Sequence, residues 1–131
     1  MTSEESALEK VKKELQNRGY SVIPRPRNSP DGDLHATKNH RTVRLEVKGL
    51  QTRNGVWLPQ HQIDAVDMVV VYIVAEDNAW VLSPQDATDL LNHYHTDFVS
   101  RNGRPPAQPG WNASQFPPPT GWAPLDKLLP D

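Results

Sequence analysis

The alternation of apolar and polar positions predicts an N-terminal helix followed by a short strand. Over residues 3–19 the apolar positions recur at helical spacing and form one stripe, made by Leu8, Val11 and Leu15. Thr2 or Ser3 can cap the start of this helix, and Gly19 is a natural terminator. Residues 20–26 are predicted to form a short strand that ends at its prolines.

A β-hairpin is predicted next. Residues 33–38 and 41–48 both alternate, and Asn39-His40 between them is suited to a two-residue loop because Asn tolerates a positive φ. Side chains in a strand alternate between its faces. Val43, Leu45 and Val47 should therefore face a core, while the opposite face carries Thr42, Arg44, Glu46 and Lys48.

The pattern after residue 50 predicts a second layer of elements around one buried strand. The run 68–75 is continuously apolar, which is typical of a strand covered on both faces, and 78–83 is its expected hairpin partner. A short strand at 56–59 and a brief helix at 60–67 are compatible with the sequence. A second helix is predicted over 83–94, with Ser83 as N-cap and Pro84 at its first position.

The character of the chain changes after Phe98. Residues 104–131 hold 8 of the 13 prolines, so this segment cannot form a long helix or a central strand. It also carries large aromatic side chains that a disordered tail seldom has: Trp111, Phe116 and Trp122. We expect a domain at residues 1–98 and a proline-rich tail at 99–131 that packs on the domain, in preference to a free proline-rich ligand.

Composition limits the class of protein. Hydrophobic residues make up 36% of the chain and charged residues 23%, which is typical of a globular domain of this length. There is no cysteine, no apolar run of transmembrane length and no apolar signal segment at the start, so we expect a cytoplasmic protein with no membrane partner. The net charge of −2 divides unevenly: residues 1–55 carry 11 basic against 7 acidic side chains, and residues 56–131 carry 3 against 9.

The predicted hairpin register brings like charges together. With a two-residue loop, Asp33 lies opposite Glu46 and Asp31 opposite Lys48, and opposed side chains have Cβ atoms about 4.5–5.5 Å apart. Two facing carboxylates repel each other unless a cation lies between them. Carboxylate oxygens are the ligands that Mg²⁺ prefers, and Mn²⁺ accepts the same donors. The sequence therefore predicts a divalent metal site on this face, beside a lysine.

The stretch "PDGD…LEVKG", at residues 30–33 and 45–49, resembles the motif of the PD-(D/E)xK nuclease superfamily, especially its Holliday junction resolvase-like and restriction endonuclease-like branch. The resemblance covers roughly residues 3–95. It implies an α/β fold with a restriction-endonuclease-like core: an N-terminal helix, a mixed sheet with a central meander, and flanking helices.

The same resemblance implies roles for particular residues. Asp33 and Glu46 would bind Mg²⁺ (or Mn²⁺), with Asp31 as the alternative to Asp33, and Lys48 would be the catalytic lysine. The family often adds a glutamate on the first helix and a glutamine after the lysine, for which the candidates are Glu4 or Glu5 and Gln60 or Gln62.

Basic and aromatic residues near these motifs are candidates for substrate contacts. Phosphates could be bound by Lys12, Lys38, Arg41, Arg44 and Arg53. Trp57 is interpreted as a core or edge-strand aromatic, and its alternative is a platform on which a base stacks.

Two functions are compatible with these features. The first is a Mg²⁺-dependent endonuclease that hydrolyses DNA, with a homodimer as an arrangement that would let two sites cut two strands. The alternative is a catalytically silent binding module of the same fold, which would act on a protein partner through the acidic second half and the proline-rich tail.

Overall fold

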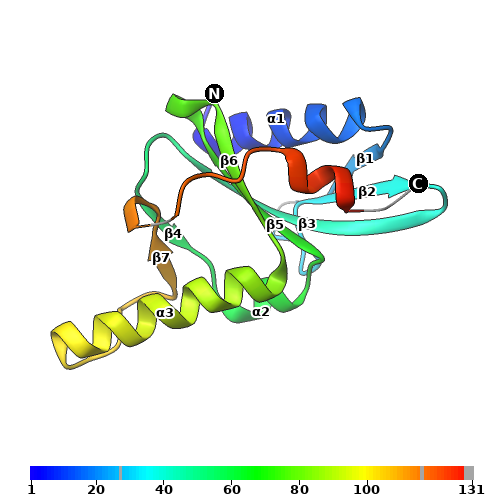
Figure 1. The fold of residues 1–131 in the computed structure, drawn as a ribbon. Coiled ribbons are helices and arrows are strands. Elements are labelled where there is room, and N and C mark those ends of the chain that lie inside the picture. Colours follow the sequence, from blue (N-terminus) through cyan, green and yellow to red (C-terminus); the bar gives the residue numbers. More distant parts are fainter. Residues whose placement is uncertain (27, 116, 129–131) are drawn as a thin grey trace.

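The computed structural model describes residues 1–26, 28–115 and 117–128. Its centre is a five-stranded mixed sheet with the order β1-β2-β3-β5-β6. The first three strands form an antiparallel meander, β5 runs parallel to β3, and β6 is antiparallel to β5. Helix α1 covers one face of this sheet and helices α2 and α3 lie on the other (Figure 1). The predicted α/β fold with a mixed sheet, a meander and flanking helices is confirmed.

Helix α1 (Ser3–Asn17) forms where the apolar stripe predicted it. The Thr2 hydroxyl caps its start by accepting a hydrogen bond from the Glu5 amide at 3.1 Å. Its buried stripe is Ala7, Val11 and Leu15, and Leu8 is only partly buried. These side chains pack on the alternate positions of β3 that point toward α1, namely Val43, Leu45 and Val47.

The meander consists of β1 (Ser21–Pro24), β2 (Leu34–Lys38) and β3 (Arg41–Leu50). The two-residue loop is confirmed: Asn39 and His40 have φ of 54° and 63°, as a mirror-image hairpin turn requires. The predicted register is confirmed as well, because Lys38 pairs with Arg41 and Leu34 with Leu45. Asp33 lies immediately before β2.

The remaining elements build the second face. They are β4 (Gly55–Trp57), α2 (Gln60–Asp64), β5 (Met68–Ile73), β6 (Asn78–Leu82) and α3 (Pro84–Asn102). As predicted, β5 is buried on both faces. Val70 and Tyr72 lie in the first core, between the sheet and α1, and Val69, Val71 and Ile73 lie in the second core, on the opposite face of the sheet. The Ser83 hydroxyl caps α3 as predicted.

Helix α3 is longer than the sequence pattern indicated. It was expected to end at residue 94, but it continues to Asn102 and is capped by Gly103 in the left-handed region, with φ of 70°. The expected division between residues 98 and 99 falls inside this helix. Whether residues 1–98 fold as a unit stays a prediction.

The proline-rich segment packs along the domain. Strand β7 (Gly110–Asn112) pairs with β4, and the chain then runs beside β6, where the Thr120 hydroxyl accepts from the Val81 amide at 2.8 Å. The ring of Trp122 lies 5.9 Å from that of Tyr72, and Trp111 is buried in the second core. Phe116 lies outside the described residues.

Among the residues that the structure describes, no helix is both long and apolar enough to cross a membrane.

Gly49 allows α1 to approach β3 closely, since a Cβ at this position would overlap the carbonyl oxygen of Ser3. We therefore expect Gly49→Ala to lower the free energy of unfolding by about 1–3 kcal/mol, because α1 must move away from the sheet. Urea unfolding followed by tryptophan fluorescence measures the change. Gly55→Ala is the matched control, since a Cβ there meets nothing, and equal losses in the two variants would contradict the prediction.

Candidate active site

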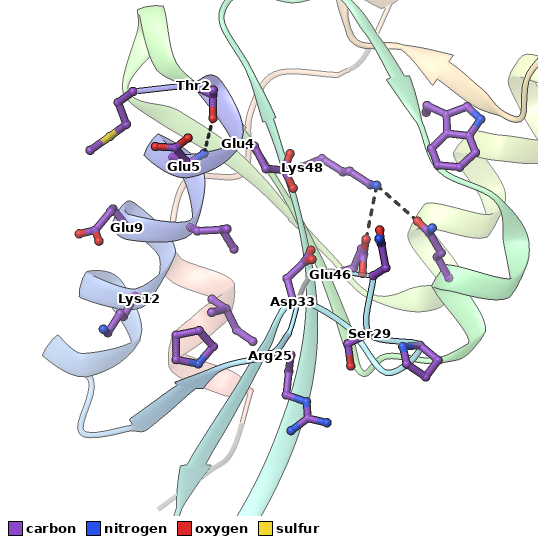
Figure 2. Close-up of a pocket in the computed structure, with 18 of the residues that line it drawn as sticks. Thr2, Glu4, Glu5, Glu9, Lys12, Arg25, Ser29, Asp33, Glu46 and Lys48 are labelled. Carbon is purple, nitrogen blue, oxygen red and sulfur yellow. Dashed lines mark hydrogen bonds and ion pairs between the residues drawn. The ribbon is translucent and has the colours of Figure 1, made fainter.

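A cleft of about 1130 Å³ opens between the first turns of α1 and helix α2. Strand β3 and the segment that precedes β2 contribute Glu46, Lys48 and Asp33 to its lining, α1 contributes Glu4, and α2 contributes Gln62. Figure 2 shows Glu4, Asp33, Glu46 and Lys48 converging from three separate segments of the chain. The cleft thus collects the catalytic candidates of the sequence in one place.

Asp33 is held by the backbone of β3. Gly32, with φ of +98°, turns the chain tightly against β3, where a Cβ would lie 2.7 Å from the Leu45 carbonyl oxygen. The Asp33 amide donates to that same oxygen at 2.8 Å, and the Asp33 carboxylate accepts from the Val47 amide at 2.8 Å. These two hydrogen bonds fix the carboxylate beside Glu46.

Glu46 is a buried carboxyl group, with only 8% of the residue exposed. Burial raises its pKa to about 7, and the negative charge of Asp33 adds to this effect, while Lys48 opposes it and Glu4 contributes weakly in the same direction as Asp33. A carboxyl with this pKa changes its charge near neutral pH. Such perturbation is typical of a functional group and is unfavourable for a purely structural one.

Lys48 bridges the two sides of the cleft. Its ammonium lies 3.4 Å from Glu46 Oε1 and donates to Gln62 Oε1 at 3.3 Å. The sequence left Gln60 and Gln62 as alternatives, and the structure brings Gln62 to the lysine. Gln60 instead donates to Asp64 and Thr88. Helix α2 thereby places one amide at the lysine and turns the other away.

Asp31, the alternative to Asp33, is held in a different group of side chains. It accepts hydrogen bonds from the Ser29 hydroxyl at 2.7 Å and from Arg25, and it lies 3.3 Å from His35. The Ser29 hydroxyl, followed by Arg25 and His35, lowers the pKa of Asp31 below its ordinary value. Asp31 does not belong to the described lining of the cleft. The geometry therefore favours Asp33 over Asp31 as the partner of Glu46.

Of the basic candidates, Lys12 lines the cleft and the others lie elsewhere. Arg44 pairs with Asp67, and Arg53 forms two hydrogen bonds of 2.7 Å with Glu76. Lys38 and Arg41 flank the hairpin loop, where Lys38 lies over the Tyr20 ring. Their role in binding a polyanion stays a prediction.

Sequence reasoning did not select several other residues that line the cleft: Arg25, Ser29 and His61. Arg25 follows the last residue of β1, and its amide donates to the Asp33 carbonyl. In the sequence, Arg25 is a basic residue between two prolines, and this pattern does not indicate where its side chain points. Glu9, which was not among the glutamate candidates of the first helix, also lines the cleft.

The donor chemistry of the cleft fits a small divalent cation. Asp33 and Glu46 offer carboxylate oxygens, and Mg²⁺ needs only one or two protein carboxylates, with water and phosphate oxygens as its other ligands. Among the described residues, no three His, Asp or Glu side chains stand together as a complete metal cage. The arrangement therefore fits a cation shared with a phosphate group and does not fit a closed structural site.

Comparisons with known proteins identify the fold. No protein-family model matches the sequence, and no curated protein matches it. Among solved structures, the chain is similar to a Holliday junction resolvase from the archaeal hyperthermophile Archaeoglobus fulgidus, with a TM-score of 0.58 and 13% identity over 89% of this chain and 97% of the other. It is also similar to a bacterial homing endonuclease, with a TM-score of 0.52 and 16% identity over 63% of this chain.

The alignment spans 64% of the length of that homing endonuclease. Both solved structures belong to the restriction-endonuclease-like PD-(D/E)xK fold. The chain therefore has the fold of these two structures, which agrees with the fold that the motif in its sequence implied.

The raised pKa of Glu46 makes stability depend on pH. The folded protein keeps Glu46 protonated up to about pH 7, whereas the unfolded chain releases the proton near the ordinary value of 4.5, so stability falls as the pH rises between these values. Without divalent metal, we expect Glu46→Gln to stabilise the protein by roughly 1–3 kcal/mol at about pH 8 and to have little effect at about pH 5.

Thermal unfolding of both proteins in EDTA at the two pH values measures this difference. Glu9→Gln, which changes an exposed carboxylate of α1, is the control. A stabilisation of Glu46→Gln that is equal at both pH values would contradict the prediction.

Proposed function

We propose that the chain is a metal-dependent endonuclease that hydrolyses phosphodiester bonds in DNA. The observation that carries this proposal is the meeting of Asp33, Glu46, Lys48 and Gln62 in one cleft. The fold adds support, because the two similar solved structures are a Holliday junction resolvase and a homing endonuclease.

In this proposal, the carboxylates of Asp33 and Glu46 would hold Mg²⁺ or Mn²⁺ in the cleft. When bound, the metal supplies a Lewis acid that polarises the phosphoryl oxygen and makes water acidic enough to attack near neutral pH. The hydrogen bond from the Val47 amide keeps the Asp33 carboxylate in place before substrate arrives. A bound cation would also favour the ionised form of Glu46, since its positive charge opposes both the burial and the Asp33 charge that raise the pKa of this carboxyl group.

Lys48 acts on the reacting groups. Its ammonium stabilises the negative charge that develops on the phosphate oxygens during attack. Gln62 and Glu46 hold this ammonium from two directions, at 3.3 and 3.4 Å. The attacking water is oriented by the same ammonium, so that Lys48 has both a positioning and a charge-stabilising role. Lys12 and Arg25 also line the cleft and are the basic candidates for contacts with flanking phosphates.

The test is a cleavage assay with a lysine variant and a matched control. Purified protein is incubated with supercoiled plasmid, a branched DNA and single-stranded DNA, in Mg²⁺, in Mn²⁺ and in EDTA. We expect metal-dependent cleavage that Lys48→Ala lowers by roughly 10²- to 10³-fold. Lys13→Ala, an exposed lysine of α1, should cleave like the wild type.

Absence of cleavage by a well-folded wild type on every substrate would reject the proposal. That result would favour the silent binding module, for which the next experiment is isolation of a stoichiometric protein partner.

Metal binding is tested without activity. Ligands that bind only the folded state raise its melting temperature. We expect Mg²⁺ or Mn²⁺ to stabilise the wild type, and we expect Asp33→Asn to abolish most of this shift. Asp31→Asn is the control that separates the two candidate ligands, and a loss of the shift in Asp31→Asn alone would assign the metal to Asp31.

A further inference from the structure

Trp57 is a large aromatic side chain exposed at the edge of the cleft. It is 49% exposed, while its neighbours Val56 and Leu58 are buried in the second core at 3% and 0%. The sequence favoured a core or edge-strand role for this residue. The structure places it on a two-stranded edge, with its side chain on the opposite face of β4 from Val56 and in the lining of the cleft.

The backbone around Trp57 keeps the indole available to a ligand. Trp57 pairs with Gly110 of β7, so the residue directly opposite it has no side chain. A Cβ at Gly110 would overlap the Val56 carbonyl oxygen and would come within 3.2 Å of the Trp57 Cα. The close pairing of β4 with β7 thus requires glycine opposite Trp57, and it holds the tryptophan on a paired strand.

The indole also lies next to the proposed catalytic lysine. The Lys48 ammonium is 5.6 Å from the centroid of the Trp57 ring. A phosphate in contact with this ammonium would have the sugar and base of a flanking nucleotide within reach of the indole. An indole can stack on an unpaired base of any kind, whereas a base pair inside a duplex has both faces covered by its neighbours.

The charges on the walls of the cleft also favour a DNA strand that lies beside Trp57. The α1 wall carries three acidic side chains, Glu4, Glu5 and Glu9, against one basic side chain, Lys12, so its net charge is unfavourable to phosphates. The wall formed by β4 and α2 contributes Trp57, His61 and Gln62 and no acidic residue to the described lining. We therefore expect a DNA strand bound in the cleft to lie along the wall that contains Trp57.

We propose that Trp57 stacks on an unpaired base beside the phosphate at Lys48, so that the substrate is single-stranded or locally unpaired DNA. This inference rests on the proposed nuclease function and specifies the substrate of the same site.

The first experiment measures DNA binding and cleavage by Trp57→Ala and Trp57→Phe. Labelled single-stranded DNA and a duplex of the same sequence are titrated in EDTA, where cleavage is suppressed, and are then cut in Mg²⁺. Loss of base stacking should weaken single-strand binding by roughly 5- to 150-fold and leave duplex binding nearly unchanged. Trp57→Phe should restore most of the affinity, and Val99→Ala, an exposed apolar residue of α3, is the control.

Kinetics separate stacking from an indirect effect on Lys48. Stacking predicts a higher KM on single-stranded DNA with little change in kcat. A role of the indole in positioning Lys48 predicts a lower kcat on every substrate, and this result would overturn the proposal.

A second experiment changes the DNA and not the protein, by removing single bases. Single abasic nucleotides are introduced at successive positions around the cleavage point. One position should weaken binding by the wild type and have no further effect in Trp57→Ala, because each change removes the same contact. If no position behaves in this way, the stacking proposal fails.

The two proposals fail in distinguishable ways. Cleavage by the wild type with equal losses on duplex and single strand in Trp57→Ala rejects the stacking role and retains the nuclease. Absence of cleavage by the wild type rejects the nuclease, and with it the substrate assignment.

Discussion

Repulsion between two carboxylates, Asp33 and Glu46, is the constraint on which the rest of the site depends. A folded protein keeps two like charges close together only where other interactions hold them there. Here the Val47 amide binds the Asp33 carboxylate, and the sheet buries Glu46. Burial raises the pKa of Glu46 most, and the charge of Asp33 raises it further. Lys48 offsets this repulsion in part, and it is itself held from α2 by Gln62.

Tight backbone contacts make this arrangement possible. Gly32 allows the segment before β2 to turn against β3, and Gly49 allows the start of α1 to lie on the same strand. Larger residues at either position would separate elements that supply side chains to the cleft. The side chains of the candidate site thus depend on two glycine positions, which links the packing of the fold to the geometry of the cleft.

The walls of the cleft differ in chemistry because they come from different parts of the fold. Helix α1 carries acidic side chains in its first turn, where the helix dipole favours them, and these side chains also face the cleft. The opposite wall depends on β4, which is held in place by the proline-rich segment through β7. That segment is therefore part of the architecture of the site, and its packing positions Trp57.

The sequence by itself determined the hairpin and its register, because alternation fixes which side chains share a face and a two-residue loop fixes how the strands pair. Asp33, Glu46 and Lys48 belong to that one local unit, so their proximity could be predicted. Other features depend on long-range packing. Contacts with Ser29, Arg25 and His35 hold Asp31 outside the lining of the cleft. The connection from β3 to β5 through α2 brings Gln62, and not Gln60, to Lys48. The exposure of Trp57 was decided only by the tertiary structure, since it follows from the pairing of two short strands more than 50 residues apart in the chain.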